Sequence, residues 1–341
     1  MPFSPQRVFF EEEALDYPIG KKMWVLFSSK YGVVIQKLKP KQRITNIPGS
    51  SPEEAYREGK RTLVVGIRKT LDFQTCKPSA HFQLPLVTGC MGQCEYCYLN
   101  TQFGKKPYVR VYVNLEEILY QTARYIEKRK PEITIFEGAA TSDPVPVEPY
   151  TNSLASTIKF FAEQEYGIFR FVTKFTDVES LLNIDHQQKT TIRFSINADH
   201  VIETYEHFTP PLIKRLEAAK KVARAGYPLG FIVGPVMILD GWQEQYLQMF
   251  EHIRTFLSGS YQGKITFEII SHRFTARAKT TITSVFPGTT LPMDESARKF
   301  KYGQFGYGKY IYPPDQMEAI SSFFTREVKY SFPGSSISYI V

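Results

Sequence analysis

Cysteine is scarce in this sequence of 341 residues, and its scarcity limits the kinds of site that the chain can build. There are only four cysteines, and three of them, Cys90, Cys94 and Cys97, fall within eight residues. A disulfide framework would normally have an even number of cysteines at wider spacing, whereas this group contains three within eight residues. A structural zinc site needs four protein ligands, and the nearest histidine, His81, lies on the strand side of the loop. The grouping therefore argues against both kinds of site.

Long hydrophobic runs are also absent. No stretch of eighteen apolar residues occurs, so we expect no membrane span. The first five residues, Met1 to Pro5, lack the basic-then-apolar order of a secretory signal. Together with the grouped thiols, this indicates a reducing cytoplasm. No internal repeat or low-complexity run occurs, and 43% hydrophobic with 22% charged residues is ordinary for a globular protein.

Acidic residues are fewer than basic ones. The chain has 42 Lys plus Arg against 34 Asp plus Glu, a net charge of +8, and it contains 21 Tyr and 26 Phe, often beside Lys or Arg. A positive surplus favours polyanionic partners, and rings that stack on bases strengthen the case for a nucleic acid. The alternative is that most of these rings are core, which we favour for Phe.

The segment from Cys90 to Tyr98, with the spacing Cys-x3-Cys-x2-Cys, is the main chemical motif. Thiolates are soft ligands, and three on one short loop can hold three irons of a cubane cluster while the fourth iron stays open for a small molecule. Zinc and inert buried thiols are the lesser alternatives. The remaining cysteine, Cys76, lies outside the motif, and we expect it to be a small buried structural thiol.

Residues 1–80 are irregular and interrupted by prolines. Residues 23–27 and 62–66 favour short strands, and residues 51–60 favour a helix begun by a serine and a proline. We expect this region to be an N-terminal appendage that packs on a barrel formed by residues 81–273. Residues 274–341 would form a C-terminal segment.

Strand-like and helix-like segments alternate from residue 81 onward. Six strands alternating with helices predict an α/β fold of parallel β/α units, closed or partly closed as a barrel, and we expect the partial (β/α)6 form. The expected strands are 82–87, 133–136, 169–172, 190–196, 229–233 and 264–270, and the expected helices are 115–130, 150–166, 177–182, 211–225 and 244–257. In such barrels the chemistry lies at the carboxyl ends of the strands, so the cysteine loop and the segments that follow the other strands should share one rim.

The C-terminal segment has a different composition. Residues 274–284 are basic and rich in threonine, and residues 298–312 interleave glycines with lysines and tyrosines. The second pattern predicts a β-hairpin that presents cations and flat rings, which suits a nucleic-acid backbone and an extruded base. The alternative is a hairpin that only closes an edge of the barrel. The residues expected to contact the nucleic acid are His272, Arg273, Lys301 and Tyr302.

The three-cysteine spacing, with the aromatic Tyr96 before the third cysteine, resembles that of the radical S-adenosylmethionine (SAM) superfamily. The resemblance implies a [4Fe-4S] cluster whose open iron binds SAM and, when reduced, cleaves it to a 5′-deoxyadenosyl radical. It assigns the SAM amino group to Ser142 and nearby backbone, and the adenine to the 232–234 backbone that ends at Gly234. The carboxylate and ribose would be met by Lys174, whose ammonium can pair with a carboxylate, and by Ser195 or Asn197. The alternative for Lys174 is a solvated surface lysine.

Residues 90–100, the Phe-Glu-Gly stretch at 136–138 and the basic hairpin resemble the spore photoproduct lyase family, along nearly the whole chain. The resemblance implies a carbon–carbon lyase that repairs 5-thyminyl-5,6-dihydrothymine in UV-damaged DNA, starting with removal of hydrogen from C6 of the lesion. It also implies an electron donor such as flavodoxin or ferredoxin and a cytoplasmic location in the spore core or germinating spore. We expect a monomer.

One position departs from that family. Its cysteine that returns a hydrogen atom to the product is replaced here by Ala140, whereas Tyr96 and Tyr98 occupy the positions of the tyrosines that relay the radical. An engineered replacement that blocks repair is the interpretation that we favour, and a homologue with another donor such as Cys76 is the alternative. We therefore expect the chain to bind cluster, SAM and lesion but to form little clean thymine pair.

Two other functions remain open at this point. One is a radical SAM enzyme that modifies RNA or protein, although such enzymes often carry a second cysteine cluster or an accessory domain, and neither is present. The other is a non-enzymatic nucleic-acid-binding protein with a structural metal, which would contain zinc and would not cleave SAM.

Overall fold

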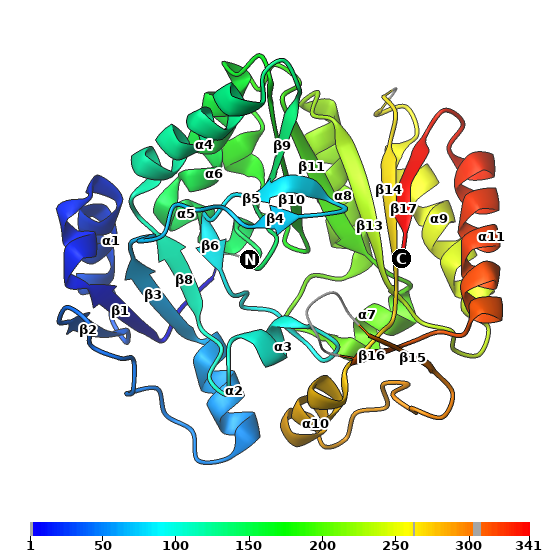
Figure 1. Ribbon diagram of the computed structural model, residues 1–341, viewed down its shortest axis with the longest axis horizontal. Coiled ribbons are helices and arrows are strands. Elements are labelled where there is room, and N and C mark those ends of the chain that lie inside the picture. Colours follow the sequence, from blue (N-terminus) through cyan, green and yellow to red (C-terminus); the bar gives the residue numbers. More distant parts are fainter. Residues whose placement is uncertain (1–2, 262, 303–307) are drawn as a thin grey trace. The chain divides into compact units, whose positions relative to one another are not determined.

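The computed structural model describes residues 3–261, 263–302 and 308–341 (Figure 1). The chain forms two compact units, which are described separately. Unit 1 contains Met1–Met91 and Phe103–Thr191, and unit 2 contains Gly92–Gln102 and Ile192–Val341. The expected division of the sequence at residues 80 and 273 stays a prediction.

Unit 1 contains a five-stranded sheet with the order β2-β1-β3-β8-β6. Neighbouring strands are parallel except for β6, which is antiparallel to β8. Strand β3 is buried at every position, as its apolar sequence predicts. Cys90 comes two residues after β6, so this sheet holds the start of the cysteine loop. The strands are β1 (Arg7–Glu11), β2 (Val34–Leu38), β3 (Thr62–Gly66), β6 (Val87–Thr88) and β8 (Val109–Tyr112).

The strand expected at residues 23–27 was wrong, because this segment lies within helix α1 (Pro18–Ser28). Pro18 occupies the first turn, where proline is favoured. The buried residues Gly20, Met23 and Phe27 recur at helical spacing. A run of five apolar residues does not by itself distinguish a strand from a buried helix. Here the flanking Pro18 favours the start of a helix.

The helix expected at residues 51–60 is confirmed as α2 (Pro52–Lys60). The hydroxyl of Ser51 accepts a hydrogen bond from the backbone N–H of Glu54 at 3.1 Å. This is the N-cap that the sequence predicts. The carboxyl end of α2 brings Lys60 to the cysteine loop, as described below.

A second group of strands in unit 1 carries the segment after β9. Strand β5 is parallel to β9, β9 is parallel to β10, and β4 is antiparallel to β5. The strand expected at 82–87 therefore divides between β5 and β6, which belong to different sheets. Helices α4 and α6 lie along β9 and β10 (Figure 1). The bounds are β4 (Thr75–Cys76), β5 (Ala80–Gln83), β9 (Thr134–Glu137), β10 (Gly167–Thr173), α4 (Leu115–Arg129) and α6 (Ser153–Ala162).

The helix expected at 150–166 is interrupted. It forms α5 (Glu148–Thr151) and α6, which are separated by Asn152 with a φ of 54°. Asparagine tolerates this left-handed conformation better than most residues do. The short 3-10 helices of unit 1 are η1 (Glu12–Asp16), η2 (Val145–Val147) and η3 (Glu179–Leu181).

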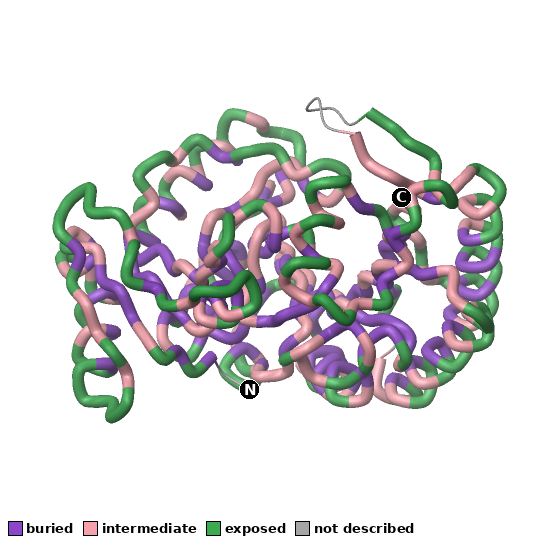
Figure 2. The backbone as a smooth tube through the Cα atoms, turned by 90° about the horizontal axis from the view of Figure 1, so that it is seen from below, coloured by how far each residue is buried: buried purple, intermediate pink, exposed green. Residues whose placement is uncertain are grey.

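Unit 2 is built on parallel strands in the order β17-β14-β13-β11. The helices pack with their apolar faces inward, and Figure 2 shows α11 buried on one side and exposed on the other. The bounds are β11 (Thr190–Ile196, of which residues 192–196 lie in unit 2), β13 (Leu229–Val236), β14 (Thr266–Ser271), β17 (Ser336–Ile340), α7 (Asp199–Tyr205), α8 (Leu212–Arg224), α9 (Trp242–Leu257) and α11 (Pro314–Ser331).

The remaining elements of unit 2 form the cysteine loop and the C-terminal hairpin. They are β7 (Gln93–Cys94), α3 (Leu99–Gln102), β12 (Glu206–His207), α10 (Ala276–Val285), β15 (Lys299–Tyr302) and β16 (Gly308–Ile311). Among the residues that the structure describes, none of the helices is both long and apolar enough to span a bilayer.

Candidate active site

None of the three cysteines of the motif forms a disulfide with the described residues. Cys90 follows β6 in unit 1 and is partly exposed, and its backbone carbonyl accepts a hydrogen bond from the Lys60 ammonium at 2.9 Å. In unit 2, Cys94 is buried and the N–H of Cys97 donates to the Cys94 carbonyl at 3.2 Å. His81 lies elsewhere, because its Nδ1 accepts the backbone N–H of Ile135 at 3.0 Å. Three thiols are the donor set of an iron–sulfur cluster, but no three His, Cys, Asp or Glu side chains among the described residues converge into a metal site.

In unit 2, hydrogen bonds to the backbone hold residues 93–100 of the cysteine loop in place. Strands β7 and β12 pair antiparallel, so that Cys94 faces Glu206. The N–H of Glu95 donates to the carbonyl of Tyr205 at 2.9 Å, and the Asn100 side chain donates to the carbonyl of Cys94 at 3.1 Å. The loop is therefore a fixed structure in which neither Cys94 nor Cys97 depends on a disulfide.

The side chain of Glu95 gives the loop a further anchor. One of its carboxylate oxygens lies 2.8 Å from Nε2 of His207, and the other accepts a hydrogen bond from the Thr289 hydroxyl. These contacts connect the loop to β12 and to the segment after α10. They are absent from any reading of the sequence, because the partners are more than a hundred residues apart.

Tyr96 is held by a buried ion pair. Its phenol donates to Glu206, whose second oxygen accepts from Arg215 at 2.6 Å. The side chains of Glu206 and Arg215 are both 0% exposed, and Arg215 also donates to the carbonyl of Ser195 at 2.9 Å. Burial, together with the negative charge of Glu206, raises the pKa of Tyr96 well above its ordinary value. The phenol is therefore neutral and fixed in orientation. By contrast, Tyr98 is 59% exposed.

In unit 1, the segment after β9 lies beside the start of the cysteine loop. The N–H of Gly89 donates to the carbonyl of Thr141 at 2.9 Å, and Gly89 and Ser142 form an isolated parallel bridge. The hydroxyl of Ser142 is buried and makes no hydrogen bond with the described residues. Buried polar atoms are nearly always paired, so this hydroxyl suits a partner that the described residues do not supply. Ala140 is partly exposed in the same segment.

Asp143 ties this segment to the end of β10. Its carboxylate accepts hydrogen bonds from the Thr173 hydroxyl at 2.8 Å and from the Lys174 backbone N–H at 2.9 Å. Burial raises the pKa of Asp143 to about 6, although these hydrogen bonds act in the opposite direction. The structure thus fixes the backbone at Lys174 relative to the segment that carries Ser142, within unit 1.

The expected SAM residues of unit 2 lie at the ends of β11 and β13. Asn197 is buried, and its amide donates to the carbonyl of Pro235 at 2.9 Å and accepts from the Tyr246 phenol at 2.7 Å. These bonds fix the orientation of the amide, while Ser195 remains partly exposed. At Gly234 an added Cβ would lie 3.0 Å from the Cβ and the carbonyl oxygen of Ile270. A larger residue at this position would displace the neighbouring strand.

His272 is held inside unit 2 by Arg298. The guanidinium donates to the His272 carbonyl at 2.8 Å and lies 3.2 Å from its Nδ1. Arg298 also stacks over the Tyr312 ring, 3.7 Å from the centroid. Burial and the charge of Arg298 lower the pKa of His272 to about 3, so the imidazole is neutral. His272 therefore supports the base of the hairpin and carries no positive charge at neutral pH.

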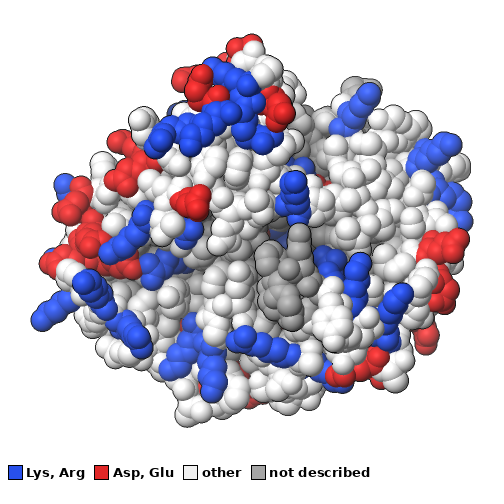
Figure 3. Space-filling view, in the orientation of Figure 1, with Lys and Arg blue, Asp and Glu red and all other residues white. Residues whose placement is uncertain are grey.

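The hairpin predicted in the C-terminal segment is confirmed, with β15 antiparallel to β16. Strand β15 is exposed and β16 is half-buried (Figure 2). Residues 303–307, which include the predicted Gly306 and Tyr307, lie outside the described residues. Basic side chains lie over this region of unit 2 together with a few acidic ones (Figure 3).

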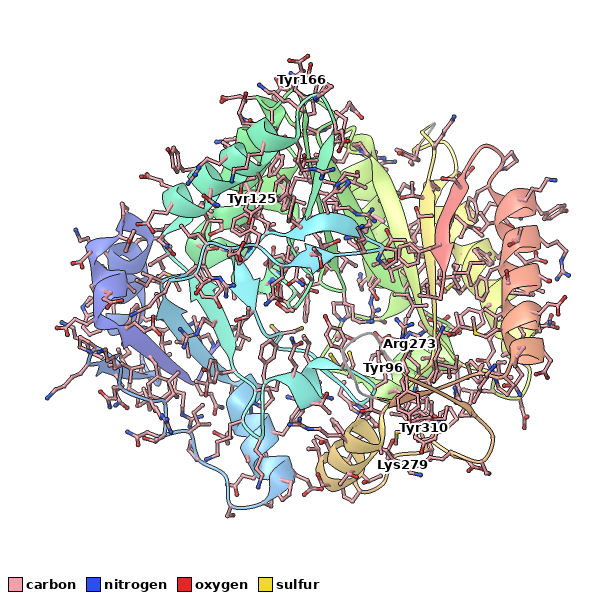
Figure 4. The ribbon with its side chains drawn as sticks, viewed as in Figure 1. Tyr96, Tyr125, Tyr166, Arg273, Lys279 and Tyr310 are labelled. Atoms are coloured by element: carbon pink, nitrogen blue, oxygen red, sulfur yellow. The ribbon has the colours of Figure 1, made fainter. Side chains whose placement is uncertain are left out.

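Cations and rings gather on the hairpin as the sequence predicts. Lys301 lies directly opposite Lys309, and the charges of Arg273 and Lys301 contribute, after burial, to lowering the pKa of Lys309. Arg273 and Tyr310 come from the end of β14 and from β16 (Figure 4). Tyr302 is 77% exposed. Ring contacts with centroids 5.2 Å apart join the pairs Phe274–Tyr310, Tyr310–Phe300 and Phe300–Tyr302.

An α/β fold whose cysteine loop carries three thiols at this spacing is the architecture of a radical SAM enzyme, and comparisons with known proteins agree. The family model for spore photoproduct lyase matches residues 3–341. A spore photoproduct lyase of Clostridium acetobutylicum is 51% identical over 336 residues, 98% of each chain. One of Bacillus subtilis (strain 168) is 47% identical over 338 residues, 99% of this chain and 98% of that one. The chain belongs to the spore photoproduct lyase family.

Solved structures are similar over their whole length. A spore photoproduct lyase complexed with dinucleoside spore photoproduct has a TM-score of 0.97 and 44% identity, with all of both chains covered. A doubly substituted variant with bound AdoMet and dinucleoside spore photoproduct has a TM-score of 0.97 and 45% identity at the same coverage. The expected fold class, a partial radical SAM barrel, is confirmed. The chain is an enzyme of the lyase class, which excludes the non-enzymatic alternative.

Proposed function

We propose that this chain holds a [4Fe-4S] cluster on Cys90, Cys94 and Cys97, binds SAM, and acts on the spore photoproduct in UV-damaged DNA. When bound, the cluster and SAM supply the 5′-deoxyadenosyl radical that removes hydrogen from C6 of the lesion. The observation that carries the proposal is the loop of three cysteines without a disulfide, part of which is held by the pairing of β7 with β12. The solved relatives with AdoMet and with the dinucleoside lesion support it.

The chain's own residues provide the SAM contacts that we propose. The unpaired, buried hydroxyl of Ser142 is suited to the SAM amino group. Lys174 presents an ammonium for the carboxylate from a backbone that Asp143 fixes. Ser195 or Asn197 would meet the ribose, and the 232–234 backbone would pack on the adenine.

The hairpin provides the proposed DNA contacts. Arg273 and Lys301 would pair with phosphates, and the exposed ring of Tyr302 would stack beside the extruded lesion. Lys301 and Lys309 lie opposite each other, an arrangement that is destabilising unless a negative charge is present. A phosphate backbone would supply that charge. We assign His272 an indirect role, because it is neutral and buried.

The final hydrogen return is the step at which we expect this chain to be impaired. Ala140 has a methyl group where the family's donor cysteine has an S–H bond. Tyr96 and Tyr98 remain available for the relay. A solved relative in which alanine replaces a cysteine still holds the dinucleoside lesion, so the loss of this thiol is compatible with binding. An electron donor such as flavodoxin or ferredoxin and a monomeric state complete the proposal.

The test is anaerobic incubation of the reconstituted, reduced protein with SAM and the synthetic thymine-dimer dinucleotide, followed by chromatography and mass spectrometry. We expect lesion-dependent loss of the dimer with thymine adducts and little clean product. An untouched dimer with slow SAM cleavage would instead point to another substrate, such as RNA or a protein.

Two variants test the donor step in the same assay. Ala140→Cys should increase the yield of repaired thymine at least tenfold, because it restores a weak S–H bond at the family's donor position. Cys76→Ala should leave the yield unchanged if Cys76 is structural. Cys76 is partly exposed on β4, next to β5 and in the same unit as Ala140, so the expectation that it is buried was wrong. The proposal would be contradicted if the unmodified chain repaired the lesion efficiently and Cys76→Ala abolished that repair. Cys76 would then be the hydrogen donor.

A further inference from the structure

Lys60, the last residue of α2, is a buried cation for which the described residues provide no carboxylate. The residue is 2% exposed. Its ammonium has two contacts, one hydrogen bond to the Cys90 carbonyl at 2.9 Å and a position 5.2 Å above the centroid of the Tyr56 ring. Buried lysines are normally paired with an anion. A carbonyl and a ring leave most of the charge of this ammonium uncompensated.

The position of α2 does not depend on this lysine alone. An added Cβ at Gly59 would lie 2.7 Å from the backbone carbonyl carbon of Lys106, so the end of the helix is already in close contact with the 106–107 backbone. The Ser51 cap holds its other end. A neutral side chain of similar length could therefore occupy position 60. The presence of a charge there calls for a separate explanation.

We propose that Lys60 is the counter-cation of the cluster and tunes its reduction potential. This inference rests on the proposed function, because it requires a cluster on Cys90, Cys94 and Cys97. Thiolates bring negative charge into a protein interior, where charges interact strongly. Reduction adds a further negative charge, so a fixed cation that is bonded to the residue of one ligand favours the reduced form. Net charge and hydrogen bonding are established determinants of cluster potential.

The first test is a redox titration of the reconstituted protein without SAM or DNA, with the reduced cluster detected by electron paramagnetic resonance. Lys60→Met removes the charge and the hydrogen bond, Lys60→Gln removes the charge but keeps a donor, and Lys60→Arg keeps both. We expect the reduction equilibrium constant to fall at least tenfold in the Met and Gln variants, which is ~59 mV towards negative potential for one electron. The Arg variant should stay close to the unmodified protein.

Arg57→Gln is the matched control. Arg57 lies on the exposed face of the same helix, so its charge is screened by solvent and the potential should not change. If the Met variant does not fold, the comparison of Lys60→Gln with Lys60→Arg gives the same test, because both keep a donor to Cys90.

The second readout separates tuning from a structural role. In cluster-free protein, Lys60→Met should leave the thermal midpoint unchanged or raise it, because it removes an uncompensated buried charge. In cluster-loaded protein the same change should lower the midpoint. A merely structural lysine would lower both.

The two levels of proposal fail in different ways. If the unmodified protein binds no iron–sulfur cluster, the proposed function fails. If it binds one and both Lys60→Met and Lys60→Gln keep its potential, the role of Lys60 is overturned while the proposed function stands.

Discussion

Two tyrosines that flank the third cysteine have opposite environments. The Tyr96 phenol is bonded to the buried pair of Glu206 and Arg215, whereas Tyr98 is largely exposed. A relay between them would therefore join a fixed phenol to one that solvent or substrate can reach. The buried ion pair is the feature that determines the position of the first.

Arg215→Met should destabilise the protein strongly. The change leaves the Glu206 carboxylate buried without its cation, and breaking such a pair typically costs about 3–5 kcal/mol. Urea unfolding followed by circular dichroism measures the difference. Arg224→Gln, on the exposed face of the same helix, should change stability by no more than about 0.5 kcal/mol. Equal effects of the two changes would contradict our account of the pair.

Tyr302→Ala should weaken binding to lesion DNA more than it slows SAM cleavage. Stacking of a base on an aromatic ring contributes about 1–3 kcal/mol, so we expect a loss of between about fivefold and a hundredfold in affinity. Fluorescence anisotropy with a lesion-containing duplex measures binding, and chromatography measures 5′-deoxyadenosine. Tyr120, 70% exposed on α4, provides the control Tyr120→Ala. Equal loss of both activities in the Tyr302 variant would count against the hairpin's role.

At the scale of elements, the junction between α5 and α6 contains a titrating group. Glu148 is 2% exposed, and its carboxylate accepts the backbone N–H groups of Leu154 and Ala155 at 2.8 and 2.9 Å. Burial outweighs these bonds and raises the pKa of Glu148 from 4.5 to about 7. The folded protein therefore binds this proton more tightly than the unfolded chain does.

It follows that the contribution of Glu148 to stability falls as the pH rises from about 4.5 to about 7 and then levels off. Glu148 contributes up to about 3 kcal/mol to that fall, judged from the size of the shift. Glu148→Gln should remove this contribution, so that the difference in thermal midpoint between pH 5 and pH 8 shrinks. Glu116→Gln, at an exposed position of α4, should leave the difference unchanged. Asp143, whose pKa is raised to about 6, will keep part of the dependence. An unchanged difference in the Glu148 variant would show that this carboxyl does not titrate in the expected range.

Elements were predictable where the local pattern agrees with the packing. Strand β11 has the expected bounds of 190–196, and α8 ends before Gly226, which has a φ of 84°. The strand prediction for residues 23–27 was wrong, because a short apolar run is compatible with either a strand or a helix. The five-stranded sheet of unit 1 was not expected, since its strand β8 lies more than forty residues after β3. Such pairing has no local signal.

At the scale of the whole molecule, motifs were predictable and their supports were not. The cysteine spacing and the alternation of lysine and tyrosine identified the loop and the hairpin. Lys60 has the sequence context of an ordinary lysine at a helix end, and Tyr96 meets a partner 110 positions away. Only the folded chain brings Lys60 to the Cys90 carbonyl and Tyr96 to Glu206. The family model for spore photoproduct lyase matches residues 3–341, so the resemblance found from a few motifs extends over nearly the whole chain.

The buried ammonium of Lys60 also bears on how long a chain survives in a cell. A chain that has lost its cluster would keep the cation without its anion. Such a chain unfolds more often, and unfolded chains are the ones that proteases remove. With the role that we propose for Lys60, the same side chain would shorten the lifetime of the cluster-free protein, and the surviving population would consist mainly of loaded enzyme.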